Sequence, residues 1–221
     1  SKKALDPSRL DSSIGALLQA CRSSDPLFYL EGEPIRCGDF VAIYGEDSAL
    51  PYLGFINDGK ISPDGKIEVL WMYRQDDVSS GVISREEKRL RANGLWSPLL
   101  SGKVEVFFSF HRDMCPQESV LEKLKVVVTK EADVVLHDPS SGRPGGLPKG
   151  VLLVRYVYDC SKSRIYSIRS RDFQCGMQAV LDFAMEHYPY DPVERDEKDV
   201  PAVDPAASAA AAALPTAASA A

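Results

Sequence analysis

The chain has 221 residues, of which 44% are hydrophobic, so it is long enough for one domain with a sizeable core and some appendages. Its 26 Lys and Arg against 32 Asp and Glu give a net charge of −6, the wrong sign for a protein that binds nucleic acid by neutralising phosphates. This balance suits a basic partner better. Five widely spaced cysteines without a C-x-x-C pair indicate neither a disulfide framework nor a zinc cluster.

The composition changes along the chain and divides it into three parts. Residues 1–30 form an N-terminal extension in which LDSSIGALLQACRS predicts one short amphipathic helix. Residues 31–190 form the main domain and end in a helix predicted over 172–187, which Tyr-Pro stops. Residues 191–221 are a low-complexity Ala/Pro tail that is expected to be disordered. No apolar run reaches transmembrane length, so we expect a soluble intracellular fragment of a longer protein.

The main domain is rich in short β-type runs separated by turn residues. These runs cover 39–45, 52–57, 66–74, 104–110, 123–129, 132–138, 151–159 and 164–168. One segment, 84–103, interrupts the series, and its charged first half favours a helix. Because helices do not alternate with the strands, we predict a mainly β fold, a distorted small β-barrel or antiparallel sheet with a few flanking helices.

The triplet HRD at 111–113 raises the question of a protein kinase, whose catalytic loop opens with the same letters. The other kinase elements are missing from the sequence: Tyr44 follows VAI where the lysine belongs, and Glu118 occupies the asparagine position. No G-x-G-x-x-G, D-F-G or G-x-S-x-G occurs, and the three histidines lie in unrelated contexts. We therefore expect a protein that is not an enzyme and that needs neither a cofactor nor a metal.

The run KIEVLWMYR at 66–74 carries the most informative side chains. Alternation along a strand places Trp71 and Tyr73 on the same face of the sheet. Two neighbouring electron-rich rings can form two walls of a box for a quaternary ammonium ion, which their quadrupoles attract. The pattern alone equally permits both rings to pack in the core.

Several motifs occur together in a fixed order: GDFVAIY, PYLGFI, WMYR, EVFFSFHRDMCPQESVLEKLKVVV and VLLVRYVYD. This succession strongly resembles the bromo-adjacent homology (BAH) domain of chromatin proteins over about 38–173. FSFHRD is similar to the (L/F)-x-S-x-H-x-D signature of that family, which answers the question raised by HRD. Within the family, the chain looks closest to plant BAH proteins that repress genes by reading Polycomb marks.

The resemblance implies the BAH fold, a nuclear location and a role in transcriptional repression. It also implies an aromatic cage for a trimethyl-lysine, formed by Tyr52, Trp71 and Tyr73, with His111 and Asp113 of the SFHRD turn at its rim. For the last two residues a structural alternative stays open, because His111 can satisfy a turn and Asp113 can cap the following segment. Tyr44 and Trp96 are reserve candidates that are expected to pack in the core and in a loop.

The partner implied by the resemblance is the trimethylated Polycomb-site lysine of the histone H3 tail, with co-repressor proteins as further partners. Two alternatives stay open: a BAH protein-interaction scaffold that reads no methyl-lysine, and a reader of a different histone methyl-lysine. Nucleic acid is not expected as a direct ligand, and no membrane is expected. A basic histone tail would also be attracted by acidic residues that flank the cage strands, namely Glu46, Asp47, Asp76 and Asp77.

Overall fold

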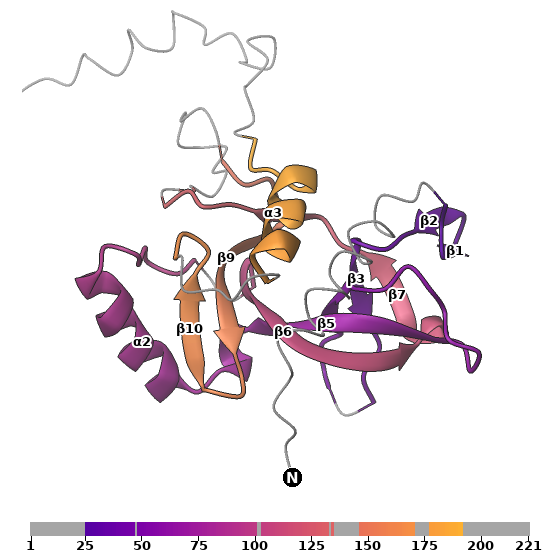
Figure 1. Ribbon diagram of the computed structural model, residues 1–221, viewed down its shortest axis with the longest axis horizontal. Helices are drawn as coiled ribbons and strands as arrows, with labels where there is room; N and C mark the ends of the chain where they lie inside the picture. The colour runs from indigo at the N-terminus through magenta and orange to yellow at the C-terminus, as the bar shows by residue number, and fades with distance from the viewer. Residues whose placement is uncertain are drawn as a thin grey trace, which may run out of the picture.

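The computed structural model describes residues 25–46, 48–100, 103–132, 134, 146–170 and 177–191. Figure 1 shows strands gathered around two long central ones, with a helix on each of two flanks. The elements in chain order are β1 (Phe28–Leu30), β2 (Glu33–Ile35), β3 (Phe40–Ile43), β4 (Tyr52–Ile56), β5 (Lys66–Arg74), η1 (Gln75–Asp77), α2 (Ser80–Ala92), β6 (Glu105–Pro116), η2 (Gln117–Ser119), β7 (Val120–Lys123), β8 (Val126–Val128), β9 (Leu152–Asp159), β10 (Arg164–Ser167) and α3 (Met177–His187).

One sheet dominates the described part of the chain. Its strand order is β10-β9-β6-β5-β4-β3-β7, with β8 paired to β9, while β1 and β2 form a separate hairpin. Most neighbours are antiparallel, but β6 and β8 each pair with β9 in parallel. The mainly β prediction is confirmed, as a mixed sheet whose strand path does not close into a barrel within the described residues.

The individual strands agree closely with the predicted runs. The prediction for 66–74 matches β5 at both ends, and 151–159 and 164–168 correspond to β9 and β10. Two runs differ. The run at 104–110 continues as β6 through the HRD triplet to Pro116, because β5 offers a partner along its whole length. The run at 123–129 divides into β7 and β8, which pair with different strands.

The helices were predicted in part. The charged segment forms α2, which begins at Ser80, four residues before the predicted start. The C-terminal helix is described from Met177 to His187, and its apolar side packs on the sheet through Val180, Leu181 and Ala184. The predicted N-terminal helix, the tail from 192 and nearly all of the run at 132–138 lie outside the described residues.

Both faces of β5 are buried, which explains its nearly continuous apolar sequence. Leu70 and Met72 pack with Phe55 and Phe108 in a core that α3 covers. Val69, on the opposite face, belongs to a second core with residues of β3 and β7. Trp71, two residues further along this face, packs at the edge of the second core, whereas Tyr73 packs against a third core that includes Phe107 and Tyr156. Both rings are half-buried.

The parallel junction between β6 and β9 is fixed by a buried ion pair. Arg155 on β9 donates from Nε and Nη2 to the two carboxylate oxygens of Glu105 on β6, each at 2.8 Å. The same guanidinium donates to the carbonyls of Ala132 and Pro98, and Glu105 accepts the amide of Leu100 at 2.7 Å. The hydrogen bonds of this ion pair therefore join the two strands to each other and to two loops.

Cys37 is disulfide-bonded, a link that the cysteine spacing did not indicate. Cys115 and Cys160 are free thiols, the first buried and the second exposed. The spacing of cysteines in a sequence does not reveal their distances in the fold, so this link was accessible only from the structure.

We predict that Arg155→Ala lowers the free energy of unfolding by about 3–5 kcal/mol, because the Glu105 carboxylate stays buried without its partner. Urea unfolding measures the loss. The matched control is Arg91→Ala, since the ion pair of Arg91 with Glu87 is on the exposed side of α2 and is expected to contribute less than about 0.5 kcal/mol. Equal losses in the two variants would contradict the anchoring role.

Candidate functional site

Tyr52 and Trp71 come together because their strands are neighbours. Gly54 pairs directly with Trp71 across β4 and β5, and Tyr52 lies two residues before Gly54, on the same face. The two rings are therefore diagonal neighbours, with centroids 5.8 Å apart and planes inclined at 67°. Tyr52 keeps 43% of its surface exposed, and Trp71 is half-buried. The pair forms a corner of two aromatic faces that is open to solvent.

The position of the Tyr52 ring depends on a glycine. A Cβ atom placed on Gly45 would lie 2.2 Å from Cε2 of Tyr52, so the ring occupies the space that a side chain would fill. Arg74, at the end of β5, holds the adjoining backbone by donating to the Pro51 carbonyl at 2.6 Å. The role of Gly45 was not predicted, although a glycine at the end of the apolar run 39–45 was a usable signal.

A bulge in β6 shapes the other side of the site. Leu70 pairs with Arg112 and Met72 pairs with Phe108, so Trp71 alone on β5 faces Ser109, Phe110 and His111 on β6. Extra residues on one strand bend it and redirect its side chains. The HRD triplet is thus part of a bulged strand, and the expectation that it forms a turn is wrong. Continued pairing with β5 keeps the backbone extended there.

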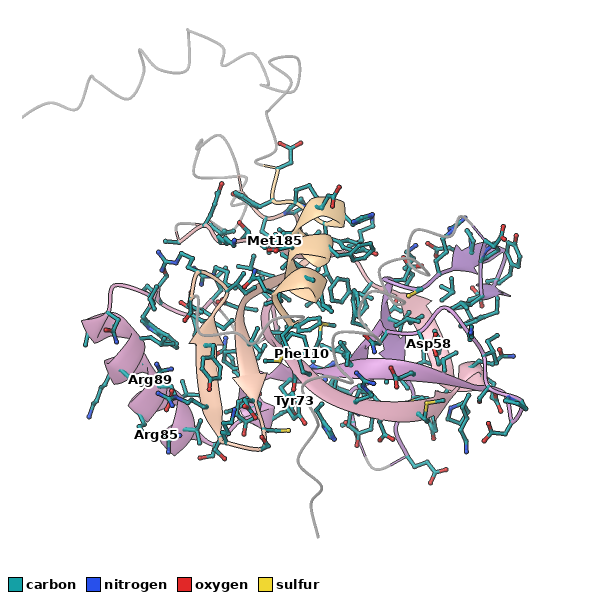
Figure 2. All side chains as sticks on the ribbon, in the orientation of Figure 1. Asp58, Tyr73, Arg85, Arg89, Phe110 and Met185 are labelled. Carbon is teal, nitrogen blue, oxygen red and sulfur yellow. The ribbon has the colours of Figure 1, made fainter. Side chains whose placement is uncertain are left out.

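The redirected His111 contacts Tyr73. The Tyr73 hydroxyl is 2.8 Å from Nδ1 of His111, and the two rings stack with centroids 6.3 Å apart. Tyr158 packs edge-on against Tyr73, with ring centroids 5.2 Å apart. Burial raises the pKa of Tyr73 well above its usual value, and the nearby Cys160 and Tyr158 add to the effect. Tyr73 therefore stays a neutral phenol. It is labelled in Figure 2.

Asp113 lies on the same sheet face, one pair away from Trp71. It pairs with Val69, which is two residues before Trp71 on β5. The carboxylate is exposed and accepts the amide of Met114 at 2.8 Å. Asp113 caps no helix, because η2 begins only at Gln117. A negative charge at this position is available to a cation that enters from solvent.

The five predicted residues therefore lie on one face of three adjacent strands, in two contacting pairs plus Asp113. The Tyr52–Trp71 corner offers π faces, whereas Tyr73 and His111 form a hydrogen-bonded pair. Such a set can attract an organic cation by roughly 0.5–2 kcal/mol for each ring that it contacts.

The reserve candidates have different roles. Tyr44 is exposed, so the expectation that it packs in the core is wrong. Trp96 packs against Tyr156 with ring centroids 4.9 Å apart, as expected for a loop residue. Of the flanking acids, Asp77 accepts the Arg74 amide at 2.7 Å and Asp76 is exposed, while Asp47 lies outside the described residues.

The described residues contain no group of three or more His, Cys, Asp or Glu that is arranged to hold a metal ion. None of the helices in this part of the chain is long and apolar enough to span a membrane.

Among solved structures, the chain is similar to the crystal structure of the yeast Rsc2 BAH domain. This chain is similar to it at 15% sequence identity with a TM-score of 0.47, over 77% of this chain and 62% of that one. The similarity thus spans less than two thirds of the length of the Rsc2 structure. No protein-family model matches the chain.

We predict that Gly45→Ala displaces the Tyr52 ring from Trp71 with little loss of stability, because the atoms in the way belong to the far end of one side chain. The indole N–H resonance of Trp71 would shift as the ring moves away. Gly81→Ala serves as control, since its Cβ would meet only Ser79 Oγ, at 3.6 Å. An unchanged Trp71 resonance in Gly45→Ala would contradict the seating of Tyr52 on Gly45.

Thiol labelling tests the placement of the Asp113 charge. Burial raises the pKa of the Cys115 thiol to about 11, and the negative charge of Asp113 adds to this. The reactive thiolate of Cys115 is therefore scarce at pH 8 and increases about tenfold for each pH unit up to about 11.

We expect Asp113→Asn to move this labelling profile to lower pH, because the repulsive charge is removed. Mass spectrometry of alkylated peptides measures it, with the exposed Cys160 as internal reference. If the pH dependence of Cys115 alkylation were the same in Asp113→Asn, the Asp113 carboxylate would not lie close to the Cys115 thiol.

Proposed function

We propose that this chain is a BAH-type chromatin reader that binds the trimethylated Polycomb-site lysine of the histone H3 tail. Tyr52, Trp71 and Tyr73 form the cage, and His111 and Asp113 lie at its rim. The observation that carries the proposal is the solvent-open corner between Tyr52 and Trp71, with rings 5.8 Å apart and inclined at 67°. Two large aromatic side chains left partly exposed at adjoining positions form an apolar surface that a ligand can cover.

The chemistry of the corner selects a methylated ammonium. A trimethylammonium group has no N–H donor and is weakly hydrated, so it loses little when it leaves water and gains contact with the ring faces. An unmodified lysine keeps three donors that the rings do not satisfy. The Asp113 carboxylate supplies long-range attraction for the cation without requiring a direct hydrogen bond.

His111 and Tyr73 supply the fixed side of the site. Because Tyr73 is hydrogen-bonded to His111 and held edge-on by Tyr158, its ring is already ordered before a ligand arrives. A preordered wall reduces the entropy that binding must overcome. His111 is exposed at the rim, where its ring can also contact the peptide that carries the lysine.

The choice of target rests on the sequence resemblance. The SFHRD and WMYR motifs are similar to those of plant readers of Polycomb marks, which favours the Polycomb lysine of histone H3 over other methyl-lysines. The proposal includes a nuclear location and co-repressor partners that convert binding into transcriptional repression. It is a binding function without catalysis.

Titration calorimetry with H3 peptides spanning the Polycomb lysine tests the proposal. The trimethylated peptide is expected to bind and the unmodified one to bind at least tenfold more weakly. Trp71→Ala is expected to weaken binding of the trimethylated peptide at least tenfold, because about 1.4 kcal/mol corresponds to a factor of ten.

The matched control is Tyr29→Ala, which removes an aromatic ring that is 66% exposed on the β1–β2 hairpin. It should leave the peptide affinity unchanged. Binding that ignores both methylation and Trp71 would refute the cage and favour the scaffold alternative. Preference for a peptide carrying another methyl-lysine would keep the cage and correct the target.

A further inference from the structure

The positive charge of this acidic protein is unevenly distributed, and one concentration of it lies on α2 and the β9–β10 turn. We define the basic surface by the side chains that share it: Arg85, Lys88, Arg89, Lys162 and Arg164. They come from two segments about 75 residues apart in the sequence. Figure 2 labels two of them, Arg85 and Arg89, on the helix that flanks β10.

One buried carboxylate gathers three of the guanidinium groups. Arg85 and Arg89 donate from Nε to Glu86 at 2.9 and 2.8 Å, and Nε of Arg164 lies 3.9 Å away. Only 4% of the Glu86 side chain is exposed, so solvent meets the arginines and not the acid. Burial by itself would raise the pKa of Glu86, but the hydrogen bonds from Arg85 and Arg89 lower it below its usual value.

The arginines are also fixed in place before any partner arrives. Arg85 donates to the Ser163 carbonyl, and Arg89 donates to the Ile165 carbonyl at 2.6 Å. Arg89 and Arg164 both lie over the ring of Tyr166, at 5.8 and 5.7 Å from its centroid. Held guanidinium groups lose little freedom when they bind an anion, and each has donors beyond those used here.

The balance of charge on this surface is positive. Glu86 and Asp159, which pairs with Lys162 at 3.2 Å, are the carboxylates that make ion pairs with it. Five cations against these two acids leave three positive charges uncompensated on this surface. Three of the cations lie on α2, which is about 20 Å long, and Lys162 and Arg164 lie in and just after the β9–β10 turn. The net charge of the whole chain conceals this local excess.

We propose that this basic surface binds the phosphate backbone of duplex DNA, independently of the methyl-lysine site. The alternative partner is an acidic protein, but protein interfaces usually have aromatic side chains at their centre in addition to arginines. Among the described residues the large exposed hydrophobic side chains all lie outside α2, β10 and the turn before it. A phosphate backbone requires only cations, and it is read without base contacts.

Fluorescence anisotropy with a labelled 20-base-pair duplex tests the proposal on the whole chain. The variant combines Lys88→Gln, Lys162→Gln and Arg164→Gln, which leaves Arg85 and Arg89 paired with Glu86. Each phosphate contact contributes about 0.9 to the slope of log K against log salt, so the slope should fall by about 2–3. Affinity at about 0.1 M salt should fall more than tenfold.

The control carries the same charge change elsewhere, in Lys60→Gln, Lys130→Gln and Lys149→Gln, all at exposed positions. It should retain the wild-type salt slope. Trp71→Ala should retain it too, which would show that DNA binding does not use the Trp71 ring. Three outcomes would overturn the proposal: no duplex binding by the wild-type chain, equal losses in the variant and the control, or equally effective competition by polyglutamate of the same charge.

Discussion

The pairing of β6 with partners on both sides is the constraint on which the rest of the structure depends. β5 pairs with it antiparallel along most of its length, and β9 pairs in parallel with its first four residues, Glu105 to Phe108. A parallel neighbour requires a long crossover connection, so distant parts of the chain must be brought back to this strand. The buried Glu105–Arg155 pair fixes that junction, since separating it would leave a charge without a partner in the core.

The same strand creates the candidate site. After Phe108, where the pairing of β6 with β9 ends, the pairing of β6 with β5 is interrupted by a bulge. At the bulge, three residues of β6 lie opposite the single residue Trp71 of β5. The bulge turns His111 to Tyr73 while β4 brings Tyr52 to Trp71 from the other side. A rigid framework thus presents partly exposed rings, which is the condition for binding a weakly hydrated cation with little reorganisation. Tyr73 and the apolar side of α2 pack against one hydrophobic cluster, so the candidate cage and the helix that carries the basic surface belong to one packed unit.

The sequence was most informative where local chemistry fixes structure. β5 was predicted at both ends because its run of β-branched and aromatic residues ends at a lysine and an arginine, and the face shared by Trp71 and Tyr73 follows from the period of two. The course of the HRD segment could not be predicted, because a bulged strand and a turn have similar local sequences. Whether a segment such as this stays extended depends on the presence of a partner strand, which is a tertiary property.

By itself, then, the sequence determined a mainly β domain, most strands of its main sheet but not the β1–β2 hairpin, and a set of aromatic and polar residues whose types suit a methylated ammonium. Only the tertiary structure decided that Tyr52 meets Trp71 on a diagonal, that Gly45 makes space for the ring, and that Tyr73 binds His111. Register, bulges and the convergence of Arg85, Arg89 and Arg164 on Glu86 depend on contacts between distant segments. Such contacts follow from how the whole chain packs, and no local pattern of residues specifies them.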